Sequence, residues 1–251
     1  MGYHHYWNDI EVEKTKAFYV TDPSDTKALR YLREDTFLER CFLDAIKYAN
    51  ERLCGVGHNV LDVAAGICWS SALVSKLEGI SKITAVDYSE HRLKMIAPIV
   101  IRQLEGRSDL IETECVDFFK ADYEKGSFDT IVFCQALYMF DDMEETLKRT
   151  AELLSPGGRV IIACERLNIP SFFSLAFLYG LLYGPKDALW QLGTKLGFIP
   201  QLDDTGKHYY TDRDYENAIR KAGLDYQFQK LDYRIFPSAF VKGGNYFGIK
   251  Q

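Results

Sequence analysis

Five short apolar segments alternate with helical patterns between residues 58 and 164, and no other feature of the chain restricts its fold as strongly. The predicted strands are 59–63, 82–86, 110–116, 127–133 and 159–163. Most are separated by stretches in which apolar residues recur at helical spacing. Nearly continuous apolar strands joined by helices are typical of parallel sheets that are buried on both faces. The alternation therefore predicts a doubly wound α/β sheet.

Capping residues mark where the predicted helices begin. Ser89 begins a helix over residues 89–104, Asp142 with Glu145 begins the next, and Thr211 with Asp214 begins the last. The turn 156–158, Pro-Gly-Gly, ends the second of these helices before the fifth strand. Two further strands, 226–235 and 245–250, follow without a helix between them, which predicts an antiparallel hairpin. The expected fold is a mostly parallel seven-stranded sheet with helices on both faces and this C-terminal hairpin.

The composition excludes several functional classes. The chain has 251 residues, 47% of them hydrophobic, and a net charge of −6, so it lacks the basic footprint of a nucleic-acid or anionic-membrane binder. Residues 1–14 contain no apolar signal-peptide core, and the most apolar stretch, 172–183, is shorter than the roughly 20 residues of a membrane-spanning helix. These features predict a cytoplasmic protein without a membrane span.

The six cysteines are widely spaced and form no Cys-x-x-Cys pair, which indicates reduced thiols. Cys68, Cys134 and Cys164 follow predicted strands at one edge of the sheet, so a metal or arsenic site there is an alternative. Buried cysteines that pack as small hydrophobic side chains are commoner. We therefore predict no metal site.

Acidic residues lie at or just after the ends of three predicted strands. They are Asp62, Asp87 and Asp117. In a doubly wound sheet, ligands bind at the carboxyl ends of the strands, where the strand order reverses. The first turn lacks the Gly-x-Gly-x-x-Gly pattern that a dinucleotide pyrophosphate requires, because Ala64 and Cys68 occupy glycine positions. An acid at the end of the second strand still suits the hydroxyls of a ribose, so a nucleoside without phosphates is favoured.

Several motifs, taken in order, resemble the class I S-adenosylmethionine (SAM)-dependent methyltransferases. The similarity covers residues 58–164 and extends more loosely to residue 251. The motifs are Leu-Asp-Val-Ala-Ala-Gly at 61–66, Ala-Val-Asp-Tyr-Ser at 85–89, Val-Asp-Phe at 116–118, Gln-Ala-Leu-Tyr-Met-Phe at 135–140 and Leu-Leu-Ser-Pro-Gly-Gly at 153–158. The resemblance implies that the chain binds SAM and releases S-adenosylhomocysteine (SAH).

The resemblance also implies a role for each motif residue. The implied cofactor contacts are Asp62, Ala64, Gly66, Asp87, Tyr88, Asp117, Phe118 and Gln135. Asp62 would orient the first loop and the ammonium group of SAM, and Asp87 would accept from the ribose hydroxyls. Asp117 would accept from the adenine amino group, with Phe118 covering the ring. Asp129, which precedes a buried strand, is expected to organise its own turn instead.

The implied domain organisation is a single methyltransferase domain over residues 1–251. It comprises an N-terminal helical cap (1–57), a SAM-binding core (58–165), an insertion (166–210), and a C-terminal helix with the edge hairpin (211–251). Insertions of this length inside compact domains are often functional, so the insertion is expected to be a lid over the acceptor. Its aromatic residues could equally supply local core or a homodimer face. They are Phe172, Phe173, Phe177, Tyr179, Tyr183 and Trp190.

The leading hypothesis is an enzyme that transfers a methyl group from SAM to a small-molecule acceptor by in-line displacement. The expected acceptor contacts are Tyr138, Glu165, Phe173 and His5, and no catalytic residue is assigned. His208 is expected to lie at the surface. A base is needed only if the acceptor must lose a proton in the transition state. The alternatives are a SAM-binding regulatory protein without transferase activity and an enzyme with other sulfonium chemistry.

Overall fold

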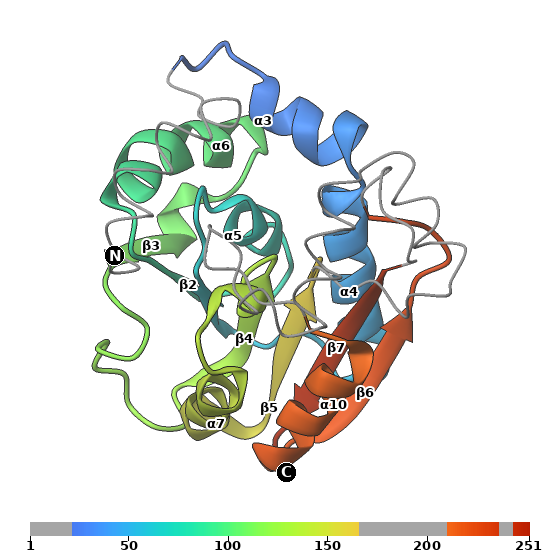
Figure 1. Ribbon diagram of the computed structural model, residues 1–251. Coiled ribbons are helices and arrows are strands. Elements are labelled where there is room, and N and C mark those ends of the chain that lie inside the picture. The colour runs from blue at the N-terminus through green and yellow to red at the C-terminus, as the bar shows by residue number, and fades with distance from the viewer. Residues whose placement is uncertain (1–21, 166–209, 236–242) are drawn as a thin grey trace, which may run out of the picture.

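The fold is a seven-stranded sheet with helices on both faces (Figure 1). The computed structural model describes residues 22–165, 210–235 and 243–251. Within them the strand order is β3-β2-β1-β4-β5-β7-β6. The strands are β1 (Asn59–Val63), β2 (Lys82–Asp87), β3 (Ile111–Cys115), β4 (Phe128–Cys134), β5 (Leu154–Ala163), β6 (Asp225–Lys230) and β7 (Gly244–Ile249). Strands β1 to β5 pair in parallel, and β7 is antiparallel to both β5 and β6. The predicted fold class is confirmed.

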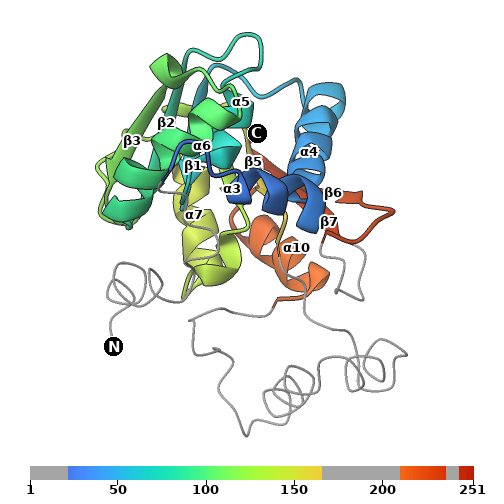
Figure 2. The same cartoon turned by 90° about the horizontal axis from the view of Figure 1, so that it is seen from above.

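The sheet separates two apolar layers. Neighbouring residues of a strand face opposite sides, so Val60 belongs to one layer and Leu61 to the other, and Ile161 and Ile162 divide in the same way. One layer contains helices α4 (Leu38–Arg52), α5 (Trp69–Val74) and α6 (Ala97–Gln103). The other contains α7 (Met143–Leu153) and α10 (Asp212–Lys221). Figure 2 shows the two sets of helices on opposite sides of the sheet.

The predicted caps hold three of the helices in place. The Ser89 hydroxyl accepts from the Arg92 N–H at 3.3 Å, and the Asp142 carboxylate accepts from the Glu145 N–H at 2.9 Å. At α10, the Thr211 and Asp214 side chains each accept from the other's backbone N–H, which completes a capping box. Ser89 opens a helical stretch whose first part is the π-helix η3 (Arg92–Ile96), which α6 continues. These helices therefore begin where the sequence predicts.

Two predicted strand boundaries were wrong. Strand β5 begins at Leu154 rather than at Arg159, because Leu154 is buried and pairs with Phe128 ahead of an irregularity in the β4–β5 pairing. The Pro-Gly-Gly turn thus lies inside the strand, and a Cβ on Gly158 would lie 2.8 Å from the Ser155 carbonyl oxygen. Strand β6 ends at Lys230 rather than at Ile235.

The segment before the sheet packs into the first apolar layer. A short helix α3 (Lys27–Arg30) and a π-helix η2 (Tyr31–Asp35) lead into α4, and Ala28, Leu32 and Phe42 are all buried in that layer. The Arg159 guanidinium donates to the Leu53 carbonyl at 2.8 Å and to the Gly55 carbonyl, which fixes the end of α4 against β5. Residues 1–21 of the predicted N-terminal cap and 166–209 of the predicted insertion lie outside the described residues.

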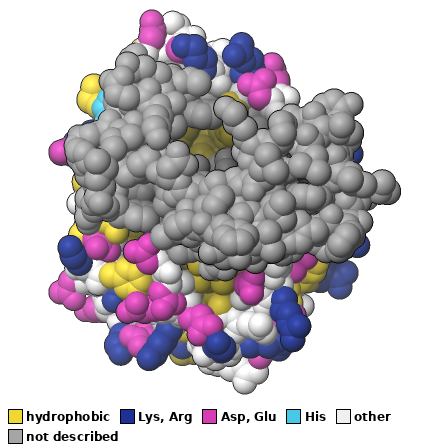
Figure 3. All heavy atoms as spheres, viewed as in Figure 1, with side chains coloured by type: hydrophobic (Ala, Val, Ile, Leu, Met, Phe, Trp, Pro, Cys, Tyr) yellow, Lys and Arg dark blue, Asp and Glu magenta, His cyan; other side chains and the backbone are white. Residues whose placement is uncertain are grey.

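The described part of the surface carries charges of both signs. On the face shown in Figure 3, acidic and basic side chains of the described residues lie interspersed. In the three described ranges, no helix is both long enough and apolar enough to cross a membrane.

Candidate functional site

The strand order reverses at β1, because β2 and β3 lie to one side of it and β4 and β5 to the other. Ligands of doubly wound sheets bind at the carboxyl edge beside such a reversal. At this edge, hydrogen bonds tie the loop after β1 to the end of β2 and the loop after β4 to the segment after β5. The Gly66 N–H donates to Asp87 at 2.8 Å, and the Ala136 N–H donates to Glu165 at 2.8 Å. The candidate site lies here.

The loop after β1 has a backbone that suits glycine at three positions. Ala64, Gly66 and Cys68 have φ values of 54°, 55° and 56°. Left-handed backbone costs an L-residue about 1–2 kcal/mol relative to the right-handed form, whereas glycine adopts it readily. Ala64 and Cys68 are the positions at which the first motif departs from its glycine-rich pattern. The turn therefore keeps its left-handed conformation with Ala64 and Cys68 in place of glycine, and the backbone is strained at these two residues.

Replacement of Ala64 by glycine is expected to stabilise the fold by about 0.5–1 kcal/mol, because relief of the left-handed strain exceeds the added entropy of the unfolded chain. Urea denaturation measures the change. Ala65→Gly is the matched control: Ala65 is buried without a positive φ, so the same change there should destabilise the fold. Equal effects of the two variants would contradict the assignment of strain to position 64.

Asp62 presents a buried carboxylate oxygen without a partner. The side chain is 2% exposed, and its Oδ2 atom accepts from the Ser70 and Ser71 hydroxyls at 2.6 and 2.5 Å. Its Oδ1 atom is buried and has no hydrogen-bond partner among the described residues. Burial raises the pKa of Asp62 to about 6. A buried orphan acceptor of this kind fits a cationic ligand group.

Asp87 joins the first two loops of the site. It is 9% exposed; Oδ2 accepts from the Gly66 N–H and Oδ1 from the Ser89 N–H, both at 2.8 Å. An ionised carboxylate has about four acceptor positions. These two bonds therefore leave capacity for two further donors, as a ribose with two hydroxyls would supply.

Asp117 lies close to the Tyr88 side chain. Asp117 accepts from the Phe119 N–H at 2.8 Å. Burial, with a smaller contribution from the Asp117 charge, raises the pKa of Tyr88 to about 12, so this hydroxyl is a donor at neutral pH. Asp117 and Tyr88 thus form one polar unit at the end of β2 and β3.

Phe118 lies in the apolar layer rather than at an open face of the site. It is 4% exposed and packs edge-on against Phe133 and Phe140, with the Arg149 guanidinium 5.2 Å from its ring centre. Phe119 is 39% exposed. Phe119 is therefore the more exposed ring of the Phe-Phe doublet that follows Asp117.

Two of the expected acceptor contacts are buried. Tyr138 is 3% exposed and Glu165 is 2% exposed. The Glu165 carboxylate accepts from backbone N–H groups of the loop after β4, so it is engaged inside the protein rather than available to an acceptor. Gln135, the first residue of that loop, is half-buried with a φ of 58°. His5, Phe173 and His208 lie outside the described residues.

Three of the buried cysteines influence one another's thiols. Cys134 and Cys164 lie at the ends of β4 and β5, and Cys41 of α4 and Cys164 each shift the pKa of the other. The Cys164 thiol also donates to the Leu38 carbonyl at 3.4 Å. Burial raises the pKa of Cys134 to about 11, so this thiol is protonated at neutral pH. In the described ranges, no three His, Cys, Asp or Glu side chains are grouped to hold a metal ion.

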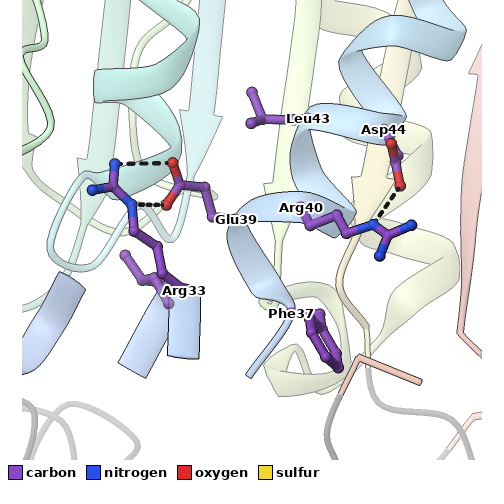
Figure 4. Close-up of a pocket in the computed structure, with 7 residues that line it drawn as sticks. Arg33, Phe37, Glu39, Arg40, Leu43 and Asp44 are labelled. Carbon is purple, nitrogen blue, oxygen red and sulfur yellow. Dashed lines mark hydrogen bonds and ion pairs between the residues drawn. The ribbon is translucent and has the colours of Figure 1, made fainter. Parts of the chain in front are cut away.

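A surface groove along α4 is a second concave feature, shown in Figure 4. It is lined by Leu32, Arg33, Phe37, Glu39, Arg40, Leu43 and Asp44. Arg33 pairs with Glu39 through two hydrogen bonds, and Arg40 lies 3.9 Å from Asp44 and stacks on the Tyr233 ring. Since its charged groups are paired with one another, the groove is a weaker candidate than the carboxyl edge.

Comparison with known proteins identifies the same region. Residues 61–162 match a family model described as a methyltransferase domain. The chain is 25% identical over 218 residues to the polyketide synthase-nonribosomal peptide synthetase phmA of Phaeosphaeria nodorum, covering 80% of this chain and 5% of that protein. It is 26% identical over 130 residues to methyltransferase GfsG of Streptomyces halstedii, covering 48% of this chain and 46% of that protein. The chain thus spans less than half of the length of either relative.

A solved structure shares the fold over its whole length. It is a SAM-dependent methyltransferase of Thermotoga maritima, described as a possible histamine N-methyltransferase, with a TM-score of 0.55, 17% identity and 100% coverage of both chains. The family match, the strand order and the acidic carboxyl edge agree. Residues 61–162 are similar to the methyltransferase-domain family, and the chain has the fold of a SAM-dependent methyltransferase.

Proposed function

We propose that this protein binds SAM at the carboxyl edge of the sheet and transfers its methyl group to a small-molecule acceptor. The observation that carries the proposal is the pair of buried carboxylates, Asp62 and Asp87, each with acceptor capacity that the described residues leave unused. One suits an ammonium group and the other suits two hydroxyls, which is the polar complement of the aminoacyl and ribose parts of SAM. The family match over residues 61–162 supports the same ligand.

Each of the remaining cofactor roles is assigned by position. Asp117 would accept from the adenine amino group, and the ring of Phe119 would lie against the base. The backbone of Ala64 and Gly66 would lie along the aminoacyl part, since the left-handed turn brings main chain rather than side chains to this edge. Tyr88 would lie beside Asp117, whose charge contributes to the raised pKa of its hydroxyl.

The protein's contribution to transfer would be alignment and exclusion of water. Bound SAM supplies a methyl group already activated on a sulfonium, so no metal or nucleophilic side chain is required. Holding donor and acceptor in line can contribute roughly 7–11 kcal/mol to lowering the barrier. We assign no general base among the described residues, because the Glu165 carboxylate is engaged by the backbone.

Calorimetry with SAH tests the proposal directly, with micromolar binding as the expected result. Methyl transfer is then followed with radiolabelled SAM and a panel of small phenols, amines, thiols and carbon acids. Binding without transfer to any acceptor would favour a SAM-binding regulatory protein, and cleavage of SAM without methylation would favour other sulfonium chemistry. Absence of SAH binding would contradict the proposal.

Asp117→Asn is expected to weaken SAH binding less than tenfold, because the amide oxygen still accepts and only the charge-assisted part of the bond is lost. Calorimetry at one pH gives the comparison. The exposed Asp122→Asn, which makes the same change five residues away, should leave the affinity unaltered. A larger loss at position 117 than Asp87→Ala causes would assign the adenine contact to another residue.

Three further expectations remain proposals. They are the lid over residues 166–210, a homodimer formed through it, and a cytoplasmic location. Residues 166–209 lie outside the described structure. Slower hydrogen exchange in that segment when SAH and acceptor are both present would support the lid.

A further inference from the structure

Glu165 is the most heavily engaged carboxylate of the candidate site. It lies two residues after β5 and is 2% exposed. Its Oε1 atom accepts from the N–H groups of Ala136 and Leu137 at 2.8 and 3.0 Å. Its Oε2 atom accepts from the Tyr138 N–H and the Tyr215 hydroxyl, both at 3.1 Å. Four donors from two separate segments therefore converge on one side chain.

The three N–H groups belong to the start of a short helix. A 3₁₀-helix, η5 (Leu137–Met139), follows β4, and its first N–H groups have no carbonyl partner within the helix. No side chain of the loop itself caps this helix. The Glu165 side chain accepts from these N–H groups instead, from the segment that follows the neighbouring strand β5.

We propose that Glu165 is a positioning residue of the cofactor site, which fixes the loop after β4 in its binding geometry. This inference rests on the proposed function. The loop begins at Gln135, an implied cofactor contact that is held at a positive φ. The Gln135 N–H donates to the Ala163 carbonyl at 2.9 Å, and Glu165 fixes the next three residues. The loop is thereby tied to β5 at every residue from 135 to 138.

Tyr215 links Glu165 to the apolar layer that contains helices α7 and α10. It is fully buried in α10, stacks on Tyr246 of β7 with ring centres 4.4 Å apart, and donates to Glu165. Glu165 therefore has a fixed rotamer as well as fixed partners. The C-terminal helix and hairpin, which contribute no implied cofactor contact, act on the site through this bond.

The test compares variants that remove different hydrogen bonds of the Glu165 side chain. In Glu165→Gln, one oxygen becomes an NH₂ group that faces either a backbone N–H or a pair of them, so at least one donor loses its acceptor. SAH affinity should fall about tenfold, and amide exchange in residues 136–138 should accelerate by a similar factor. Glu165→Ala should show larger effects in the same direction. Tyr215→Phe keeps all three backbone bonds, so a loss of about threefold or less is expected.

Asp129→Ala is the matched control. Asp129 also accepts from two backbone N–H groups, those of His58 and Asn59 at 2.8 and 3.0 Å, but it lies at the amino ends of β1 and β4. Asp129 is structural, as expected, but it holds the start of β1 rather than its own turn. Its removal should lower the melting temperature without changing the SAH dissociation constant. A lower melting temperature alone thus cannot account for weaker SAH binding in the Glu165 variants.

The combination of SAH affinity and amide exchange decides whether Glu165 positions the cofactor site. Weaker SAH binding together with faster exchange at 136–138, absent in Asp129→Ala, supports the proposal. Wild-type affinity in Glu165→Gln overturns it, whether or not exchange changes. If the wild-type protein does not bind SAH, the proposed function fails instead, and exchange at 136–138 alone then decides whether Glu165 fixes the loop.

Discussion

Replacement of Asp87 by alanine is expected to weaken SAH binding by about 100-fold, which corresponds to about 2.7 kcal/mol. Two losses contribute. The proposed ribose hydroxyls lose a charged acceptor, and hydrogen bonds to charged groups contribute about 1.5–3 kcal/mol each. The N–H groups of Gly66 and Ser89 lose their partner too, so the loop after β1 is no longer tied to β2.

Calorimetry measures this effect, with Glu90→Ala as the control. Glu90 is three residues away, and its replacement makes the same change in charge, but its side chain is 65% exposed and pairs with the exposed Lys94. Its removal should leave SAH affinity within twofold of wild type, because exposed ion pairs contribute little. An Asp87→Ala variant that binds SAH as tightly as Glu90→Ala would remove the ribose assignment and with it the main support for SAM.

The fold could be predicted because each of its determinants is local. A strand such as Val160 to Ala163 is apolar on both faces, and the caps at Ser89, Asp142 and Thr211 lie within three residues of the groups they satisfy. The start of β5 was wrong for the opposite reason. Whether Leu154 ends a helix or begins a strand depends on its pairing with Phe128, 26 residues earlier, and no local pattern records that contact.

The candidate site, too, could be predicted from the sequence only in part. The positions of Asp62, Asp87 and Asp117 could be predicted, because parallel strands bring their carboxyl ends to one edge. The role of Glu165 could not, since its partners lie 27 to 29 residues before it and 50 residues after it. A glutamate after a strand looks the same in sequence whether it faces a ligand or caps a neighbouring loop. Its burial and its four donors are properties of the folded chain alone.

The unfolding free energy of the ligand-free protein is expected to fall by several kcal/mol between pH 5 and pH 8. Burial raises the pKa of Asp62 to about 6 and that of Glu165 to about 7. In the unfolded chain both groups titrate near pH 4. From pH 4 to 7 the folded state therefore binds more protons than the unfolded state, and stability decreases as pH rises. Each shift corresponds to roughly 3 kcal/mol, fully lost above the folded-state pKa.

Other groups with resolved shifts act outside this range. The lowered pKa of Asp129 stabilises the fold above pH 4, and that contribution is lost only as the pH falls further. The buried tyrosines and cysteines have pKa values raised above their ordinary values, so they affect stability only at higher pH. The slope between pH 5 and 8 therefore reports mainly on Asp62 and Glu165.

Urea denaturation of wild type and Asp62→Asn at half-unit pH steps separates the two contributions. Asparagine keeps an acceptor for Ser70 and Ser71 but has no charge to desolvate, so the variant should lose about a third of the slope and be the more stable protein at pH 8. The same carboxylate links stability to the proposed function. An ammonium beside Oδ1 would lower the pKa of Asp62, so SAH should bind wild type more tightly as pH rises from 5 to 7 and should release a proton near pH 6. Calorimetry in buffers of different ionisation enthalpy detects that proton. Parallel stability curves for the two proteins, or proton release that persists in Asp62→Asn, would show that the buried charge of Asp62 is not what the ligand neutralises.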